Sequence, residues 1–129
     1  MQTNSIKHKL QAGGSVLGTC ITDHVSPEIV TIFKAAGLDF FFIDTEHSVP
    51  SYRDVQTLVR AGRGAGVIPL VRVTQAEYFL IARLLDVGAM GIVAPRISSV
   101  EEARRVVDAM KFTPAGNRGY GLRGIINDY

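Results

Sequence analysis

The sequence has 129 residues, 47% of them hydrophobic and 20% charged, which is typical of one globular domain with its own core. The net charge is only +2 and the basic residues are scattered, which argues against a protein that binds nucleic acid or an acidic membrane surface. No apolar stretch approaches the roughly 20 residues of a membrane span, and the polar N-terminus does not resemble a secretion signal. The single cysteine, Cys20, cannot form an internal disulfide, so we expect a cytoplasmic protein.

A short helix is expected first, over residues 5–10. Four short apolar runs follow it, each bounded by glycine or polar residues: Val16–Ile21, Phe40–Ile43, Val67–Val71 and Gly91–Ala94. Continuous apolar runs of this length are typical of strands that are buried on both faces of a parallel sheet. Pro69 cannot donate a hydrogen bond to a neighbouring strand, so we place it near the start of its strand.

Each apolar run is followed by apolar residues at helical spacing. The residues expected to face the core are Ile29, Ile32, Phe33 and Ala36; Val55, Leu58, Val59 and Gly62; Tyr78, Ile81, Ala82 and Leu85; and Ala103, Val106, Val107 and Met110. Capping residues precede all four patterns: Ser26 before Pro27, Ser51 with Asp54, Thr74 with Glu77, and Ser99 with Glu102.

The repeated order of strand and helix predicts four parallel βα units after a short N-terminal helix. Such units either close into a barrel or form an open, doubly wound sheet, and periodicity does not choose between these folds. A (β/α)8 barrel needs eight strands and about 250 residues, so this chain would supply half of one.

Polar side chains follow the predicted strands at their carboxyl ends, where parallel α/β folds place their functional residues. These segments are Thr22–His24, Asp44–His47, Arg72 and Pro95–Arg96.

The residue types at this rim suggest acid–base and anion chemistry. Arg72 can hold a carboxylate or keto oxygen through its planar fork, and His47 can move a proton near neutral pH. Asp44 and Glu46 could ligate a cation or a metal-bound water. Asp86, at a helix C-terminus that disfavours a carboxylate, is a possible partner for the histidine.

Four segments together resemble the HpcH/HpaI aldolase family, in order and with compatible spacing. They are Ile43–His47, Leu70–Val73, Leu84–Gly88 and Pro114–Gly119. The resemblance covers nearly the whole chain and implies the N-terminal half of a (β/α)8 TIM barrel, with residues 1–129 as a single partial domain that lacks the C-terminal half.

The resemblance also implies an activity, the metal-dependent cleavage of 4-hydroxy-2-oxo acids to pyruvate and an aldehyde. His47 would be the general base, paired with Asp86, and Arg72 would orient pyruvate and stabilise its enolate. Arg118 would contribute to substrate binding from a loop near the barrel mouth.

The family uses a divalent metal, commonly magnesium, manganese or cobalt. Its direct ligands, a Glu and an Asp, are expected on later strands outside this sequence, with Asp44 and Glu46 at the periphery of the metal site. We therefore expect the catalytic site to be incomplete in this chain.

Two alternatives stay open at this point. The chain could be a non-catalytic half-barrel that associates with itself, or part of a citrate-lyase-like CoA-ester lyase. A homo-oligomer is expected in either case, because an open half-barrel leaves strand edges and an apolar face uncovered.

Other residues suggest less. We expect Cys20 to be a buried, unreactive thiol. His24 and Arg96 could contact substrate from the rim, but a structural or solvated role is favoured for both. The segment 119–124 matches G-x-G-x-x-G, but it follows a helix rather than a strand, which argues against a dinucleotide site.

Overall fold

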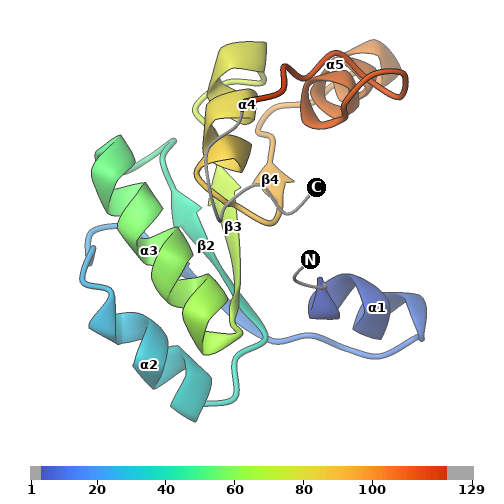
Figure 1. Cartoon of the computed structure of the whole chain (residues 1–129). Coiled ribbons are helices and arrows are strands. Elements are labelled where there is room, and N and C mark those ends of the chain that lie inside the picture. The colour runs from blue at the N-terminus through green and yellow to red at the C-terminus, as the bar shows by residue number, and fades with distance from the viewer. Residues whose placement is uncertain (1–3, 122–129) are drawn as a thin grey trace.

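The computed structural model describes residues 4–121. Its elements follow the predicted order (Figure 1). They are α1 (Ser5–Gln11), β1 (Gly18–Ile21), α2 (Glu28–Ala35), β2 (Phe40–Asp44), α3 (Tyr52–Ala65), β3 (Ile68–Arg72), α4 (Tyr78–Asp86), β4 (Ile92–Val93) and α5 (Val100–Met110).

The four strands within residues 4–121 form one parallel sheet in the order β1-β2-β3-β4. The register aligns their carboxyl ends, so that Asp44 lies opposite Arg72 and Arg72 lies opposite Val93. Pro69 is the second residue of β3 and is buried, as its predicted place near the strand start requires. The side chains that end these strands are therefore brought to one rim.

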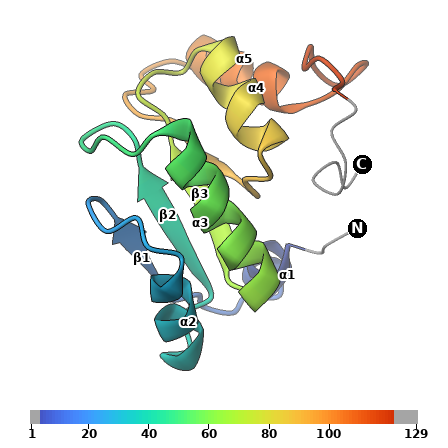
Figure 2. The ribbon, with the colours of Figure 1, turned by 60° about the vertical axis from the view of Figure 1, so that its left-hand side comes forward.

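Helices α2 and α3 cover one face of the sheet (Figure 2). Phe41 and Ile43 point from β2 into this layer and are fully buried there with Leu58. The predicted inward face of α3 is confirmed, since Val55, Leu58, Val59 and Gly62 are all buried. A Cβ atom at Gly62 would lie 2.8 Å from the Phe41 ring, so only glycine allows this close helix–sheet contact.

The predicted inward faces of α2 and α5 are partly wrong. In α2, Val30 is buried and Ile32 is 61% exposed. In α5, Val106 and Ala109 are buried, whereas Val107 is 49% exposed. In both helices, apolar residues occupy more of the helix circumference than the side that packs against the sheet. Their spacing alone therefore does not say which of them face the core.

Two of the four predicted helix starts have the expected capping box. Ser51 with Asp54 begins α3, and Ser99 with Glu102 begins α5.

The other two helix starts differ from the prediction. Helix α2 has Pro27 as its N-cap, and the Ser26 hydroxyl bonds to the Glu28 carboxylate rather than to a backbone N–H. Helix α4 begins only at Tyr78, so the predicted cap at Thr74 is wrong. The Thr74 carbonyl instead accepts a hydrogen bond from Arg96.

The face of the sheet opposite α2 and α3 is only partly covered within residues 4–121. Helix α1 lies beside the amino ends of the strands, away from α3 (Figure 1), where Asn4 donates a hydrogen bond to the Met90 carbonyl before β4 and Lys9 pairs with Asp39 before β2. Cys20 is exposed on this face, so its predicted burial is wrong. Partial desolvation and the Asp44 carboxylate raise the pKa of the Cys20 thiol, whereas Arg72 has a smaller, opposite effect. The raised pKa favours the protonated, unreactive thiol.

None of the helices within residues 4–121 is long and apolar enough to cross a bilayer.

Candidate functional site

An ion pair joins the carboxyl ends of β2 and β3. The Nε atom of Arg72 donates to Oδ1 of Asp44 at 2.9 Å, and the NH2 group of Arg72 donates to Oδ2. The Asp44 carboxylate, 2% exposed, also accepts hydrogen bonds from the backbone N–H groups of Glu46 and His47, at 2.9 and 3.2 Å. One buried carboxylate therefore fixes both the arginine and the turn that carries the histidine.

These hydrogen bonds control the ionisation of Asp44. The bond from Arg72, followed by those from the two backbone N–H groups, lowers the pKa of Asp44 from 3.8 to about 2, against the opposing effect of burial. Asp44 in turn raises the pKa of Arg72. Both groups are therefore charged at neutral pH.

Arg72 keeps donors that Asp44 does not use. A guanidinium has five N–H bonds, and the contact with Asp44 takes those of Nε and one of NH2. The NH1 group makes no hydrogen bond within residues 4–121, and the side chain is 26% exposed. Arg72 thus presents a rigid, charged edge at the rim to an incoming anion.

Glu46 lies among three basic groups. Its carboxylate is 3.6 Å from Nε of Arg72, 3.7 Å from Nε2 of His47 and 3.5 Å from NH2 of Arg96. The Glu46 side chain is 11% exposed, whereas the His47 side chain is 70% exposed. The imidazole therefore faces solvent, with one carboxylate beside it.

Asp86 and Arg118 form a second pair. NH2 of Arg118 donates to Oδ1 of Asp86 at 2.7 Å, and the guanidinium lies 4.7 Å from the centre of the Phe112 ring. Within residues 4–121 Asp86 pairs with Arg118 and not with His47, whose carboxylate neighbour is Glu46.

The loop that carries Arg118 packs against α4. The backbone N–H of Gly119 donates to the Tyr78 hydroxyl at 2.9 Å, so this loop is held beside the helix start. The predicted site residues thus fall into two groups in this chain: Asp44, Glu46, His47 and Arg72 in one, and Asp86 and Arg118 in the other.

Arg96 is also part of this rim. Arg96 follows β4, and its guanidinium donates to the Thr74 carbonyl at 2.9 Å while lying beside Glu46. Its place after Pro95 at a strand end was the available signal. The pairing with Glu46 was not visible, because 50 positions separate the two residues in the sequence.

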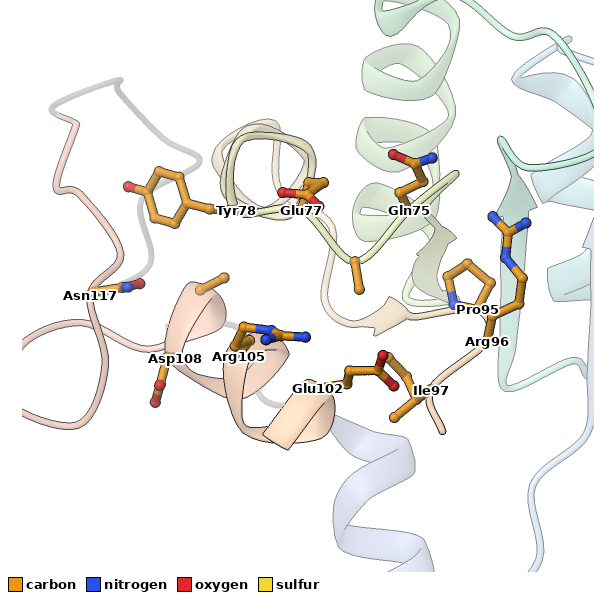
Figure 3. A pocket seen from close by; sticks show the side chains of 12 residues that line it. Gln75, Glu77, Tyr78, Pro95, Arg96, Ile97, Glu102, Arg105, Asp108 and Asn117 are labelled. Atoms are coloured by element: carbon orange, nitrogen blue, oxygen red, sulfur yellow. The ribbon is translucent and has the colours of Figure 1, made fainter. Parts of the chain in front are cut away.

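A hollow of about 710 Å³ opens beside Arg96, between the start of α4 and α5 (Figure 3). Its walls come from the β3–α4 loop, the β4–α5 segment, α5 and Asn117. Arg96 stands at one end of the hollow, and Tyr78 and Asn117 stand at the other (Figure 3).

The residues at this rim do not fit a divalent cation. Both Asp44 oxygens are already hydrogen-bonded, and both Glu46 oxygens face basic side chains. Residues 4–121 contain no group of three His, Cys, Asp or Glu side chains placed to hold a metal ion. What the rim offers chemically is hydrogen-bond donors for an anion and an exposed imidazole.

The arrangement of strands and rim residues has known counterparts. The sequence pattern of HpcH/HpaI aldolase/citrate lyase matches residues 22–126. The chain belongs to this family. The crystal structure of the HpcH/HpaI aldolase from Desulfitobacterium hafniense is 42% identical and has a TM-score of 0.86 over 90% of this chain and 45% of that one. The predicted fold, the N-terminal half of a TIM barrel, is confirmed.

Curated relatives from this family include two aldolases. The hydroxypyruvate/pyruvate aldolase of Roseovarius nubinhibens is 36% identical over 92% of this chain and 46% of its own length. The 4-hydroxy-4-methyl-2-oxoglutarate aldolase tasA of Hapsidospora irregularis is 37% identical over 89% of this chain and 43% of its own length. The chain therefore spans a little under half the length of these relatives.

Proposed function

We propose that this chain is the pyruvate-binding half of an aldolase barrel that cleaves a 4-hydroxy-2-oxo acid to pyruvate and an aldehyde. The observation that carries the proposal is the buried ion pair of Asp44 with Arg72, which fixes a guanidinium at the barrel mouth beside His47. The two curated relatives support this reaction type, because both are aldolases and one is named for a 4-hydroxy-2-oxo acid.

Arg72 would bind the 2-oxo acid end of the substrate. Its unused N–H donors suit a carboxylate or keto oxygen, and a guanidinium is charged at neutral pH in any setting. Negative charge develops on the keto oxygen as the enolate of pyruvate forms. A positioned donor stabilises that charge more than it stabilises the neutral ketone.

His47 would move the proton. As base it takes the proton of the C4 hydroxyl, the C3–C4 bond breaks, C4 becomes the aldehyde carbonyl, and the electron pair passes into the enolate of pyruvate. Protonation of the enolate at C3 completes pyruvate. Among residues 4–121, Glu46 lies 3.7 Å from Nε2 and could orient the imidazole.

The resemblance implies a divalent metal, but the rim carboxylates of this chain are already engaged by other groups. We propose that the ligands of such a metal lie outside residues 4–121. Magnesium, manganese and cobalt are then the cations to supply in an assay.

Binding to the chain itself tests the proposal. We expect pyruvate, added to the ¹⁵N-labelled chain, to shift the backbone resonances of the β2–α3 turn and of Arg72. Arg72→Met should abolish these shifts, and Arg104→Gln, an exposed arginine on α5, should leave them unchanged. Identical shifts in the Arg72→Met variant would contradict the assignment of the site.

Turnover tests the reaction. The chain joined to the C-terminal half of the Roseovarius nubinhibens relative should release pyruvate from a 4-hydroxy-2-oxo acid in an assay coupled to lactate dehydrogenase. His47→Asn should lower kcat about a hundredfold or more, as loss of a general base does. A folded fusion that binds pyruvate but has the same kcat with and without His47 would exclude the histidine as base.

A further inference from the structure

Arg96 has an unusual backbone conformation. Its φ is 54°, and it is the one non-glycine residue with a positive φ among residues 4–121. Glycine or asparagine adopts this conformation at lower cost than a long side chain does. A strained backbone of this kind persists where surrounding contacts hold it and is concentrated at functional sites.

The contacts of Arg96 leave most of its guanidinium unused. The NH2 group donates to the Thr74 carbonyl at 2.9 Å and lies 3.5 Å from Oε1 of Glu46. Nε and NH1 make no hydrogen bond in the described part of the chain, and the side chain is 69% exposed. The side chain is therefore held at one nitrogen and offers the others to the hollow and the rim.

Glu46 links this arginine to the proposed 2-oxo acid site. Its two oxygens face Arg96 and Arg72 respectively, so the two guanidinium groups flank a single carboxylate. Each keeps free N–H donors, and guanidinium binds carboxylate with two parallel hydrogen bonds. A molecule with a 2-oxo acid group on Arg72 can thus extend its other end toward Arg96.

The remaining charges of the hollow limit what can bind there. Glu102 is occupied by the N–H groups of Ser98 and Ser99. Glu77 and Asp108 also line the hollow and oppose an anion, whereas Arg105 lines it from α5 and lies 3.5 Å from Glu101. The Arg96 end is the one that Glu46 connects to Arg72, so a short substrate held at Arg72 would bring its second negative group there.

We propose that Arg96 is a specificity-determining residue that binds a second carboxylate, at the end of the substrate remote from its 2-oxo acid group. The proposal rests on the proposed function, because it takes the 2-oxo acid end to lie at Arg72. The Hapsidospora irregularis relative is named for a short 4-hydroxy-2-oxo dicarboxylate, so the new element is the residue that would select such a substrate in this chain.

A matched pair of ligands tests Arg96 on the chain itself. 2-Oxoglutarate and 2-oxopentanoate have carbon chains of the same length, but only the first carries a distal carboxylate. Titration of the ¹⁵N-labelled chain should give a Kd about tenfold or more lower for 2-oxoglutarate, as expected for charge-assisted hydrogen bonds. Arg96→Gln should remove this difference, and Arg104→Gln should keep it.

The outcomes separate the two proposals. If the wild-type chain binds both ligands equally, or if Arg96→Gln weakens both equally, Arg96 does not determine specificity, while 2-oxo acid binding at Arg72 stands. If neither ligand binds, the 2-oxo acid site itself is wrong and the role of Arg96 falls with it.

A second variant excludes an effect of misfolding. Arg96→Gly removes the guanidinium and suits a φ of 54°. It should lose ligand selectivity as Arg96→Gln does, with an unchanged or higher Tm. Retained selectivity in a folded Arg96→Gly variant would overturn the proposal.

Discussion

Asp44 is the residue on which the geometry of the rim depends. Its carboxylate receives the Arg72 guanidinium and two backbone N–H groups of the turn that carries Glu46 and His47. A buried carboxylate is costly unless such donors compensate it, and here they do. The same donors hold it ionised and make it a structural group of the site rather than a base.

We expect Asp44→Asn to destabilise the chain by about 2 kcal/mol, because it leaves the Arg72 guanidinium without its counter-charge. The midpoint of urea unfolding measures this effect. Asp23→Asn, in the exposed segment after β1, is the control and should change stability by less than about 0.5 kcal/mol. An equal effect of the two substitutions would show that the ion pair contributes no stability.

The lowered pKa of Asp44 also makes the free energy of unfolding depend on pH in the acid range. Its folded-state pKa of about 2 lies below the 3.8 of a free aspartate, so the unfolded chain binds the proton more readily. The stabilising contribution, at most about 2 kcal/mol, is complete above about pH 4 and is lost as the pH falls toward 2.

Other carboxylates with lowered pKa values, such as those of Asp54 and Glu102, act in the same direction. The contribution of Asp44 is therefore measured as the difference in unfolding free energy between the wild type and Asp44→Asn at pH 5 and at pH 3. That difference should shrink in acid, and a constant difference would contradict the assignment.

At the scale of elements, the helix starts decide where the loops of the site begin. The capping boxes at Ser51 and Ser99 fix the first residues of α3 and α5. Helix α4 has no such cap and starts late, so residues 75–77 line the hollow and the Thr74 carbonyl accepts a hydrogen bond from Arg96. A short capping motif is thus used at two helices and left unused at a third.

This difference is testable with one pair of substitutions. Ser51→Ala should lower the unfolding free energy by about 1 kcal/mol, because it removes the acceptor for the N–H of Asp54. Thr74→Ala should have an effect below about 0.5 kcal/mol, since its hydroxyl caps no helix. A loss at Thr74 as large as that at Ser51 would place the start of α4 at the earlier position.

At the scale of the whole molecule, the sheet has one covered face and one open face. Phe42 and Leu70 are only partly buried on the open side, and Cys20 is exposed there. Within residues 4–121, β1 and β4 each pair on one side only. Open edges and uncovered apolar surface favour association.

We therefore expect the 129-residue chain to self-associate through this open face. Sedimentation velocity over a range of concentrations should show it, and Leu70→Gln should weaken the association. Ile32→Gln, which changes an equally apolar but exposed residue on the outside of α2, should not. A monomer at every concentration, or equal effects of the two substitutions, would exclude the open face as the contact.

The order of the elements and the residues at the rim followed from the sequence alone. Strand and helix periodicity are local properties, and a residue that ends a parallel strand must lie at the carboxyl edge of the sheet. Asp44, Glu46, His47 and Arg72 could therefore be placed together without a structure, and the family resemblance chose the barrel over the open sheet.

Only the tertiary structure decided which charges pair and which apolar faces are buried. Asp86 binds Arg118 rather than His47, Glu46 connects Arg72 to Arg96, and Cys20 is exposed. Ion pairing depends on separations of a few ångströms between residues dozens of positions apart, and burial depends on what packs opposite. Neither quantity is encoded in the period of a single segment.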